Sequence, residues 1–445
     1  MTRTSPCFRL PRVRSLASLG LAAFLAAGFG AHASTPAKAP AAGAAASTPY
    51  PMFGGRALDF ERTGNKVVAV YTPNWEPAAL VDALPGNAIT HLLYAFLHVC
   101  GPGQLPIDAP KCEGKGDYEV ATSAVDRTFD EAFARLKARA PHVRVVASIG
   151  GWGGSDPFFH LADEAAPRAA FAASAAAFLR THPAFDGIDI DWEHPTTNGS
   201  ANGVALGRPE DGQGYADLML ALRGALDRLT AETGRHYLLT SAINTERVIV
   251  DKVNYRQAAP ALDLVFMMTY DYYGSWKSVA GNHATLQASG PGREDGLAAA
   301  ARTMTAAGVP KEKLVAGVAM YGRGFKGVPP PAKGAPFTGL PHSGAWPGPE
   351  GSVSWREIAA RYLDRTGRGR HGYQAIFDPV TQAWNLYDAR NRLFIGYDDP
   401  RAVLRKGAFV RGEGMAGVFA WELSQDNGDI LNAMNFGVGN LVLRP

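Results

Sequence analysis

The chain has 445 residues, of which 46% are hydrophobic and 19% are charged. A chain of this length and composition can bury a large apolar core, so it is not intrinsically disordered, and we expect one large domain or about two to three ordinary ones. The formal net charge is +3, but residues 1–33 hold four arginines and no acidic residue, so the rest of the chain carries −1. A charge so close to zero does not favour nucleic acid as a partner.

The N-terminal segment differs from the rest of the chain. Its arginines precede an apolar stretch of small residues at 16–30, which is followed by Ala31, His32 and Ala33. This order is typical of a secretory signal peptide, and we expect cleavage between Ala33 and Ser34. A membrane anchor is the alternative, but an apolar run of about 15 residues is short for a bilayer span. We therefore expect a secreted protein, extracellular or periplasmic, without membrane attachment after cleavage.

Residues 34–60 are rich in alanine, proline, serine and glycine and contain few large apolar side chains. Such a segment cannot form a core of its own, so we interpret it as a linker or flexible arm. The pattern changes at residue 66, and we assign 61–445 to the main folded domain.

Two cysteines, Cys100 and Cys112, remain after the predicted cleavage. In an exported protein an even pair at this spacing most simply forms a disulfide, although two free thiols are the alternative. Two cysteines without nearby paired histidines do not make a tetrahedral zinc site, so we expect no metal here.

Eight apolar runs follow in chain order, several of them separated by amphipathic stretches at 124–141, 168–182 and 215–234. The runs lie at 66–75, 89–99, 143–152, 185–193, 237–244, 262–274, 313–325 and 414–422. Runs that are continuously apolar, without alternation, predict strands buried on both faces, as in a parallel sheet covered by helices. Eight such units fit a (β/α)8 TIM barrel better than a doubly wound sheet, because no nucleotide-binding glycine motif is present.

The connection between the seventh and eighth runs is much longer than the others. Within it, residues 373–399 combine aromatic and β-branched residues with turn residues, which predicts two or three antiparallel strands. A structured insertion after a barrel strand emerges at the catalytic face. We therefore predict a small α+β insertion domain at 327–397 that forms one wall of a groove.

The fourth run, FDGIDIDWE, is unusually acidic. In a strand, side chains alternate between faces, so Asp189, Asp191 and Glu193 point the same way, into the barrel. Asp186 is out of phase, and we expect it to anchor the start of the strand. Crowded carboxylates in an apolar interior cannot all ionise, so at least one should stay protonated near neutral pH, as a general acid requires.

An acidic edge strand and a calcium-binding loop are weaker interpretations of the same run. A solvated edge strand would not carry the large apolar residues that lie between the acids. A calcium-binding loop starting at Asp189 would need glycine and glutamate where the sequence has His194 and Ser200.

FDGIDIDWE resembles the D-x-x-D-x-D-x-E motif of family 18 glycoside hydrolases, the chitinases, and ASIGGW on the preceding strand resembles the second motif of that family. MMTYDYYG, AMYGRGF and GVFAWELSQDNGD are similar to its sixth, seventh and eighth strand motifs. The resemblance extends from about residue 66 to the C-terminus. It implies a secreted bacterial chitinase that needs no cofactor and cleaves β-1,4 bonds between N-acetylglucosamine units with retention, using the acetamido group of the substrate itself.

The resemblance also implies roles for individual residues. Glu193 would protonate the glycosidic oxygen, Asp191 would orient the acetamido group, and Asp189 would hold the proton that lets Asp191 switch. Tyr270 would donate a hydrogen bond to the acetamido carbonyl. The substrate-binding residues implied by the resemblance or by a position at a strand end are Tyr71, Trp75, Trp152, Met268, Asp271, Trp276, Tyr321, Arg323 and Trp421.

Several assignments stay open. Trp75 and Trp276 could be loop-packing residues, and Arg323 could be a structural ion-pair partner. Ser148, Gly150 and Gly151 are expected to be structural, because close packing beside the acids leaves no room for larger side chains.

Chitin and chito-oligosaccharides are the expected partners of a monomeric enzyme. An endo-β-N-acetylglucosaminidase acting on N-glycans shares the acidic motif, but the insertion and the groove aromatics favour a long polymer. A chitin-binding lectin is a further alternative, and the presence of Glu193 argues against it. The sequence does not distinguish internal cleavage from cleavage at a chain end.

Overall fold

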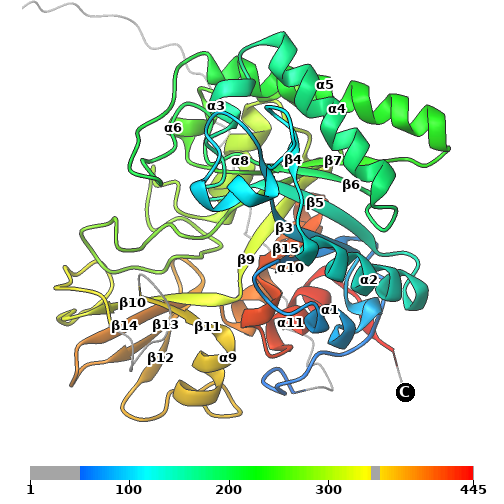
Figure 1. Cartoon of the computed structure of the whole chain (residues 1–445). Helices are drawn as coiled ribbons and strands as arrows, with labels where there is room; N and C mark the ends of the chain where they lie inside the picture. The colour runs from blue at the N-terminus through cyan, green and yellow to red at the C-terminus, as the bar shows by residue number, and fades with distance from the viewer. Residues whose placement is uncertain (1–50, 342–350, 444–445) are drawn as a thin grey trace, which may run out of the picture. The chain divides into compact units, whose positions relative to one another are not determined.

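Eight parallel strands form a closed barrel in the computed structural model, which describes residues 51–341 and 351–443 (Figure 1). Their hydrogen-bonded order is β2-β15-β9-β8-β7-β6-β5-β3, and pairing of β2 with β3 closes the circle. The barrel strands are β2 (Val67–Pro73), β3 (His91–Val99), β5 (Arg144–Gly150), β6 (Gly187–Asp191), β7 (Leu238–Ile243), β8 (Leu264–Met267), β9 (Leu314–Ala319) and β15 (Gly417–Trp421). The predicted (β/α)8 barrel is therefore confirmed.

The barrel strands are buried on both faces, as their apolar sequences predict. Phe266, Phe419 and Val315 pack inside the barrel, and the rings of Phe266 and Phe419 lie 5.1 Å apart. A larger cluster of aliphatic and aromatic side chains fills the space between strands and helices. Beside this apolar packing, the buried acidic side chains of β6 are exceptional and mark a candidate site.

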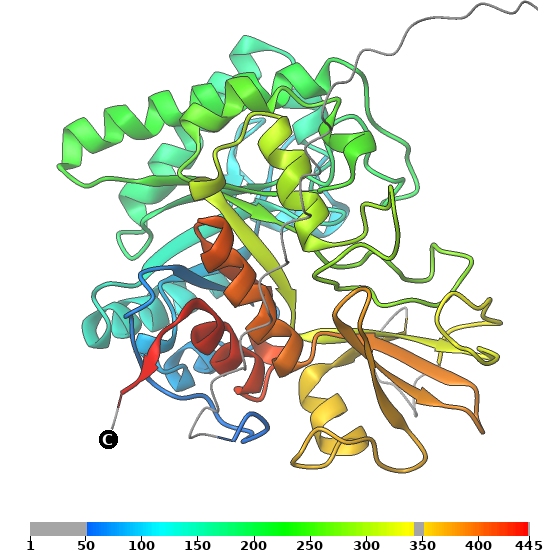
Figure 2. The same ribbon diagram turned by 180° about the vertical axis from the view of Figure 1, so that it is seen from behind.

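Helices surround the barrel (Figures 1 and 2). The longer ones are α2 (Ala124–Arg139), α4 (Ala165–Thr181), α5 (Asp211–Thr233), α8 (Leu297–Ala306), α10 (Pro400–Glu413) and α11 (Asp429–Val438). Shorter helices are α1 (Ala79–Ala83), α3 (Phe158–Leu161), α6 (Arg247–Val250) and α7 (Tyr255–Ala258). The three amphipathic stretches predicted as helical correspond to α2, α4 and α5. Helix α2 begins at a capping box formed by Ser123 and Asp126, which satisfies its first free N–H groups.

A second sheet is inserted between β9 and β15 and lies beside the barrel (Figure 1). It is antiparallel, with the order β11-β10-β14-β13-β12. Its elements are β10 (Tyr321–Lys326), β11 (Ser352–Ser354), α9 (Trp355–Glu357), β12 (Gln374–Asp378), β13 (Ala383–Asp388) and β14 (Leu393–Tyr397). Two or three antiparallel strands were expected at 373–399, and three are present, β12, β13 and β14. The sheet starts before residue 327, because only Met320 separates β10 from β9.

Two short pairings complete the described strands. Strand β1 (Phe60–Glu61) pairs with β16 (Leu441–Val442), and β4 (Val120–Ala121) pairs with the end of β3. The predicted signal peptide and most of the predicted linker lie outside the described residues. Within 51–341 and 351–443, no helix has the length and apolar character needed to span a membrane.

Candidate active site

Asp189 is fully buried in the barrel and is surrounded by hydroxyl groups. Tyr71 and Ser148 donate hydrogen bonds to its Oδ2 at 2.9 and 2.7 Å, and Thr240 donates to Oδ1 at 2.6 Å. The register explains this arrangement, because Asp189 pairs with Ser148 of β5 on one side and with Thr240 of β7 on the other. Burial raises the pKa of Asp189, while the three hydroxyl donors act in the opposite direction.

Asp191 is the last residue of β6, and its side chain is also buried. Its Oδ1 has no hydrogen-bond partner within the described part of the chain. Burial, followed by the charges of Glu193 and Asp189, raises the pKa of Asp191 well above its ordinary value. A buried carboxyl oxygen without a partner is costly unless a ligand supplies the missing donor.

Glu193 lies beyond the end of β6, although we expected it to be part of the strand. Its side chain is 15% exposed, so the carboxyl group reaches the mouth of the barrel. Burial is the main cause that raises the pKa of Glu193 to about 8, and the charge of Asp271 is the second. The Trp152 N–H group acts in the opposite direction and lowers this pKa. His194 Nε2 lies 3.8 Å from Glu193 Oε2, and burial lowers the pKa of His194 to about 4. At neutral pH Glu193 can therefore hold a proton beside a neutral imidazole.

A second polar cluster follows β8. Arg323 on β10 makes a bidentate ion pair with Asp271, with N–O distances of 2.8 and 2.7 Å. His283 Nδ1 lies 3.3 Å from Asp271 Oδ1, and His283 Nε2 lies 3.1 Å from the Tyr321 carbonyl oxygen. Burial alone would raise the pKa of Asp271, but the hydrogen bonds from His283 and Arg323 outweigh it and hold this pKa below its ordinary value. Asp271 is thus a permanent negative charge that faces Glu193.

Tyr270 lies between the two polar clusters. Its ring is 6.3 Å from that of Tyr321 and 6.1 Å from that of Phe419. Burial is the main cause that raises the pKa of Tyr270, and the charges of Asp191 and Glu193 add to it. The hydroxyl of Tyr270 is therefore a neutral hydrogen-bond donor near the unpartnered Asp191.

Trp421, at the end of β15, stands in an aromatic cluster with residues from β2 and β3. Its ring stacks on Phe96 at 5.5 Å and 19°, and the rings of Tyr71 and Trp75 lie 5.3 and 6.3 Å away. Trp75 is 62% exposed, whereas Tyr71 is buried with its hydroxyl on Asp189. Tyr71 therefore lies beneath the site, deeper than the strand mouth where we expected it.

Trp152 and Trp276 are both more than half exposed, at 60% and 51%. Trp152 follows β5, and its ring lies 6.4 Å from that of His194. The guanidinium carbon of Arg323 lies 5.2 Å from the ring of Trp276, which is within the range of a cation–π contact. Met268 packs against the aromatic and aliphatic side chains inside the barrel. Exposed tryptophans therefore follow three different barrel strands.

The predicted structural residues lie close to the acids or beneath them. Gly150 and Gly151 both have positive φ, and a Cβ at Gly150 would lie 2.2 Å from the Asp191 carbonyl oxygen. Asp186 lies at the opposite end of β6, where it accepts hydrogen bonds from Lys137 and from the Val145 N–H group.

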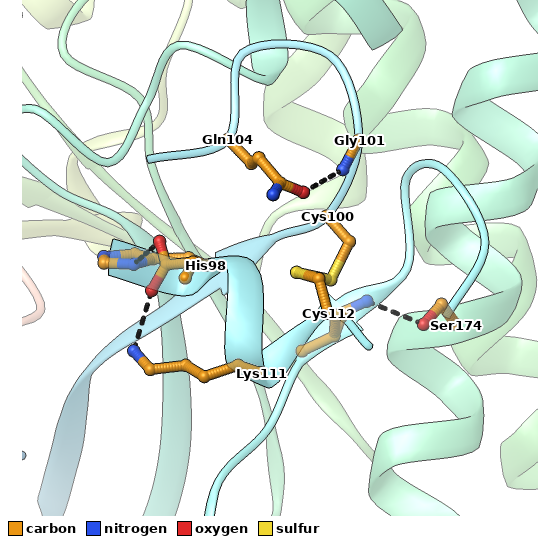
Figure 3. The surroundings of a disulfide bond; sticks show 9 residues. His98, Cys100, Gly101, Gln104, Lys111, Cys112 and Ser174 are labelled. Atoms are coloured by element: carbon orange, nitrogen blue, oxygen red, sulfur yellow. Dashed lines mark hydrogen bonds and ion pairs between the residues drawn. A yellow bond between two sulfur atoms is a disulfide. The ribbon is translucent and has the colours of Figure 1, made fainter. Parts of the chain in front are cut away.

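Cys100 and Cys112 form the expected disulfide (Figure 3). Cys100 directly follows β3, and Cys112 follows the 3-10 helix at Pro106–Lys111. Asp108 of this helix is buried and binds His98 Nδ1 at 2.6 Å and Lys111 Nζ at 2.8 Å. The disulfide and the contact between Asp108 and His98 together hold this loop at the end of β3.

Four neighbours of the site were absent from the sequence prediction: Phe96, Ser155, Thr240 and His283. Only Thr240 had a usable signal, because it is a polar residue in an apolar run and the parallel register places it beside Asp189. Phe96 is one of several large apolar residues in its run, and Ser155 and His283 lie in connections without periodicity.

Within the described ranges, no group of three or more histidine, cysteine and acidic side chains is arranged to hold a metal ion. A cavity of about 570 Å³ lies at the other end of the barrel, where the strands begin, and its lining includes Lys66, His91, Leu264 and Met415. None of the predicted site residues lines this cavity.

A closed parallel barrel with titratable groups at the C-terminal ends of its strands is the architecture of TIM-barrel enzymes. Residues 67–426 match the model of glycosyl hydrolases family 18. The chain therefore belongs to this family.

Known proteins with similar sequences and structures agree with the family match. Chitinase A of Pseudoalteromonas piscicida is 35% identical over 426 residues, covering 83% of this chain and 51% of the relative. The chain thus spans about half the length of that relative. The structure of chitinase ChiA74 from Bacillus thuringiensis has a TM-score of 0.73 at 25% identity, covering 84% of this chain and 70% of that one. A family 18 chitinase from Cycas revoluta in complex with (GlcNAc)3 has a TM-score of 0.68 at 25% identity, covering 84% and 100%.

Proposed function

We propose that the protein is a chitinase that hydrolyses β-1,4 bonds between N-acetylglucosamine units by a retaining, substrate-assisted mechanism. The observation that carries the proposal is the series Asp189, Asp191 and Glu193, which leads from the barrel interior to its mouth and leaves Asp191 Oδ1 without a partner among the described residues. The names of the relatives support chitin as the substrate.

Glu193 is the proton donor in this proposal. Its raised pKa keeps the carboxyl group protonated near neutral pH, and its position at the barrel mouth gives it access to a glycosidic oxygen. Proton transfer from Glu193 to that oxygen breaks the bond to the leaving sugar.

The acetamido group of the sugar on the other side of the bond is the nucleophile. Its carbonyl oxygen attacks the anomeric carbon to give an oxazolinium ion, which water then opens with net retention while the Glu193 carboxylate takes up the proton that the water loses. Asp191 accepts the acetamido N–H, which supplies the missing donor, and Tyr270 donates to the acetamido oxygen. Asp189 and its three hydroxyl partners hold Asp191 in a crowded, buried environment that favours a shared proton.

The aromatic residues supply the surface for the sugar chain. Trp421, supported by Phe96, is the floor under the reacting sugar, because the axial C–H bonds of a pyranose form an apolar face. Trp75, Trp152 and Trp276 bind sugars further along the polymer, which fits their exposure. The insertion at 327–397 forms one wall of the groove, and Arg323 and Tyr321 on β10, the strand that precedes residue 327 and begins the inserted sheet, join this wall to the site.

We also propose that the protein acts outside the cytoplasm as a monomer, after removal of residues 1–33. The order of arginines, apolar segment and small residues supports this location. The disulfide fits an oxidising compartment.

The test is hydrolysis of colloidal chitin and of soluble chito-oligosaccharides by wild type and by Glu193→Gln. The substitution keeps the shape of the side chain but removes the transferable proton, so turnover should fall by at least about a hundredfold while chitin binding is retained. Near-normal turnover of Glu193→Gln would contradict the assignment. Cleavage of an N-glycan but not of chitin by wild type would refute the proposed substrate.

A further inference from the structure

Ser155 lies in the connection after β5 and is 1% exposed. Its Oγ accepts a hydrogen bond from the Glu193 N–H group at 3.0 Å and lies 2.9 Å from the carbonyl oxygens of both Asp191 and Gly151. A serine hydroxyl has one proton, so it donates to one of these carbonyls at a time while it accepts from Glu193. One side chain therefore touches the backbone on both sides of Trp192, at the end of β6.

The same connection holds this segment at other points. The Gly151 N–H group donates to the Asp191 carbonyl oxygen at 2.8 Å, and the Trp152 N–H group interacts with the Glu193 carboxyl group. Residues 151–155 thus contact both the main chain and the side chain of the acid. Trp152, the exposed aromatic residue in this connection, lies three residues before Ser155.

Neighbouring loops pack closely against the connection that follows β5. Asp156 accepts hydrogen bonds from Asn198 at 3.0 Å and from Asn202 at 2.9 Å. A Cβ at Gly103 of the disulfide loop would lie 2.8 Å from the Asp156 carbonyl carbon, and a Cβ at Gly154 would lie 2.8 Å from His98 Nε2. The two glycines leave no room for a side chain between the loops, so the loops pack closely around the connection that holds Ser155.

We infer that Ser155 is a positioning residue for the proton donor: its hydroxyl fastens the chain around Glu193 to the connection that carries Trp152. The inference rests on the proposed function of Glu193. Ser155 does not touch the reacting atoms, and it acts by fixing where the carboxyl group meets the glycosidic oxygen. A small displacement of a catalytic group is enough to slow proton transfer.

The experiment compares Ser155→Ala with Ser241→Ala on a soluble chito-oligosaccharide. Ser241 on β7 is a matched control, because it is also fully buried and its hydroxyl donates to a main-chain carbonyl oxygen of β6. The acceptor is Ile190, at 2.7 Å, and Ser241 does not contact Glu193. We expect Ser155→Ala to lower kcat about tenfold with KM within about twofold of wild type, since substrate binding is left intact. Ser241→Ala should lower the thermal midpoint without either kinetic change.

The pH profile supplies a readout that a purely structural residue would not move. The groups that face the Glu193 carboxyl are Asp191 on β6, Tyr270 and Asp271 after β8, and His194 beside it, with Arg323 paired to Asp271. These groups stay in place in Ser155→Ala, while a loosened Glu193 becomes better hydrated. The alkaline limb of kcat/KM should therefore move to lower pH in Ser155→Ala and stay in place in Ser241→Ala.

Wild-type kcat and an unmoved alkaline limb in Ser155→Ala would overturn the inference, as would an equal kinetic loss in Ser241→Ala. If Ser155→Ala does not fold, Ser155→Cys takes its place, because a thiol of similar shape is a weaker hydrogen-bond partner. Wild-type kinetics of Ser155→Cys would then overturn the inference. An active Glu193→Gln variant would instead refute the proposed function, so the two failures are distinguishable.

Discussion

Asp271 and Arg323 form a bidentate ion pair that joins the end of β8 to the first strand of the inserted sheet, with N–O distances of 2.8 and 2.7 Å. The Asp271 side chain is about one-third exposed and that of Arg323 is less so. The pair keeps Asp271 ionised, and this charge is the second cause, after burial, of the raised pKa of Glu193. The inserted sheet therefore influences the Glu193 carboxyl group electrostatically, through the residue that Arg323 holds ionised.

Asp271→Asn tests this electrostatic link. Removing a negative charge that faces Glu193 makes its ionised form less unfavourable, so the pKa of Glu193 falls from about 8 and the alkaline limb of kcat/KM moves to lower pH. Asp263→Asn is the control, because Asp263 directly precedes the other end of β8. Identical alkaline limbs in wild type and Asp271→Asn would show that Asp271 does not act on the proton donor.

Trp75→Ala and Trp276→Ala should weaken hydrolysis of chitin more than hydrolysis of short soluble oligomers. Both side chains are more than half exposed, and stacking on sugar rings away from the scissile bond contributes only when the chain is long enough to reach them. The comparison uses the ratio of the rates on the two substrates for each variant. An equal loss on both substrates, or no loss on either, would assign these residues to loop packing.

Much of the fold was predictable because parallel barrel strands are buried on both faces and appear as continuous apolar runs. The same property left the boundary between two consecutive strands unmarked in the sequence. The run at 313–325 has no proline and no charged residue between Leu314 and Gly322, but the chain leaves the barrel at Met320, so the run contains both β9 and β10. Nothing in the local sequence marks the change of sheet, since each part is buried within its own sheet.

The acids of the site were predictable from strand alternation, and their surroundings were less so. Asp189 and Asp191 share a face because they are two residues apart on β6. The contact of Ser155 with Glu193 joins the connections that follow β5 and β6, whereas His283 and Asp271 lie twelve residues apart within the connection that follows β8. Contacts between irregular segments have no periodic signal in the sequence, so neither pairing was predictable from strand or helix patterns.

Replacing both Cys100 and Cys112 by serine should lower the free energy of unfolding by about 3 kcal/mol, because the bond closes a loop with a sequence separation of 12. The measurement is urea unfolding of wild type and of the double variant under oxidising conditions. Wild type in the presence of a reductant is the control and should approach the double variant. Equal stability of oxidised wild type and the double variant would mean that the bond does not constrain the unfolded chain.

The central claim is that the acetamido group of the substrate, and not Asp191, attacks the anomeric carbon. The most direct measurement is the identity of the new reducing ends formed from partially deacetylated chitosan, since a glucosamine unit without its acetyl group cannot provide the attacking oxygen. We predict N-acetylglucosamine at essentially every new reducing end. Frequent glucosamine at those ends would contradict substrate assistance and would point to a carboxylate nucleophile in the same barrel.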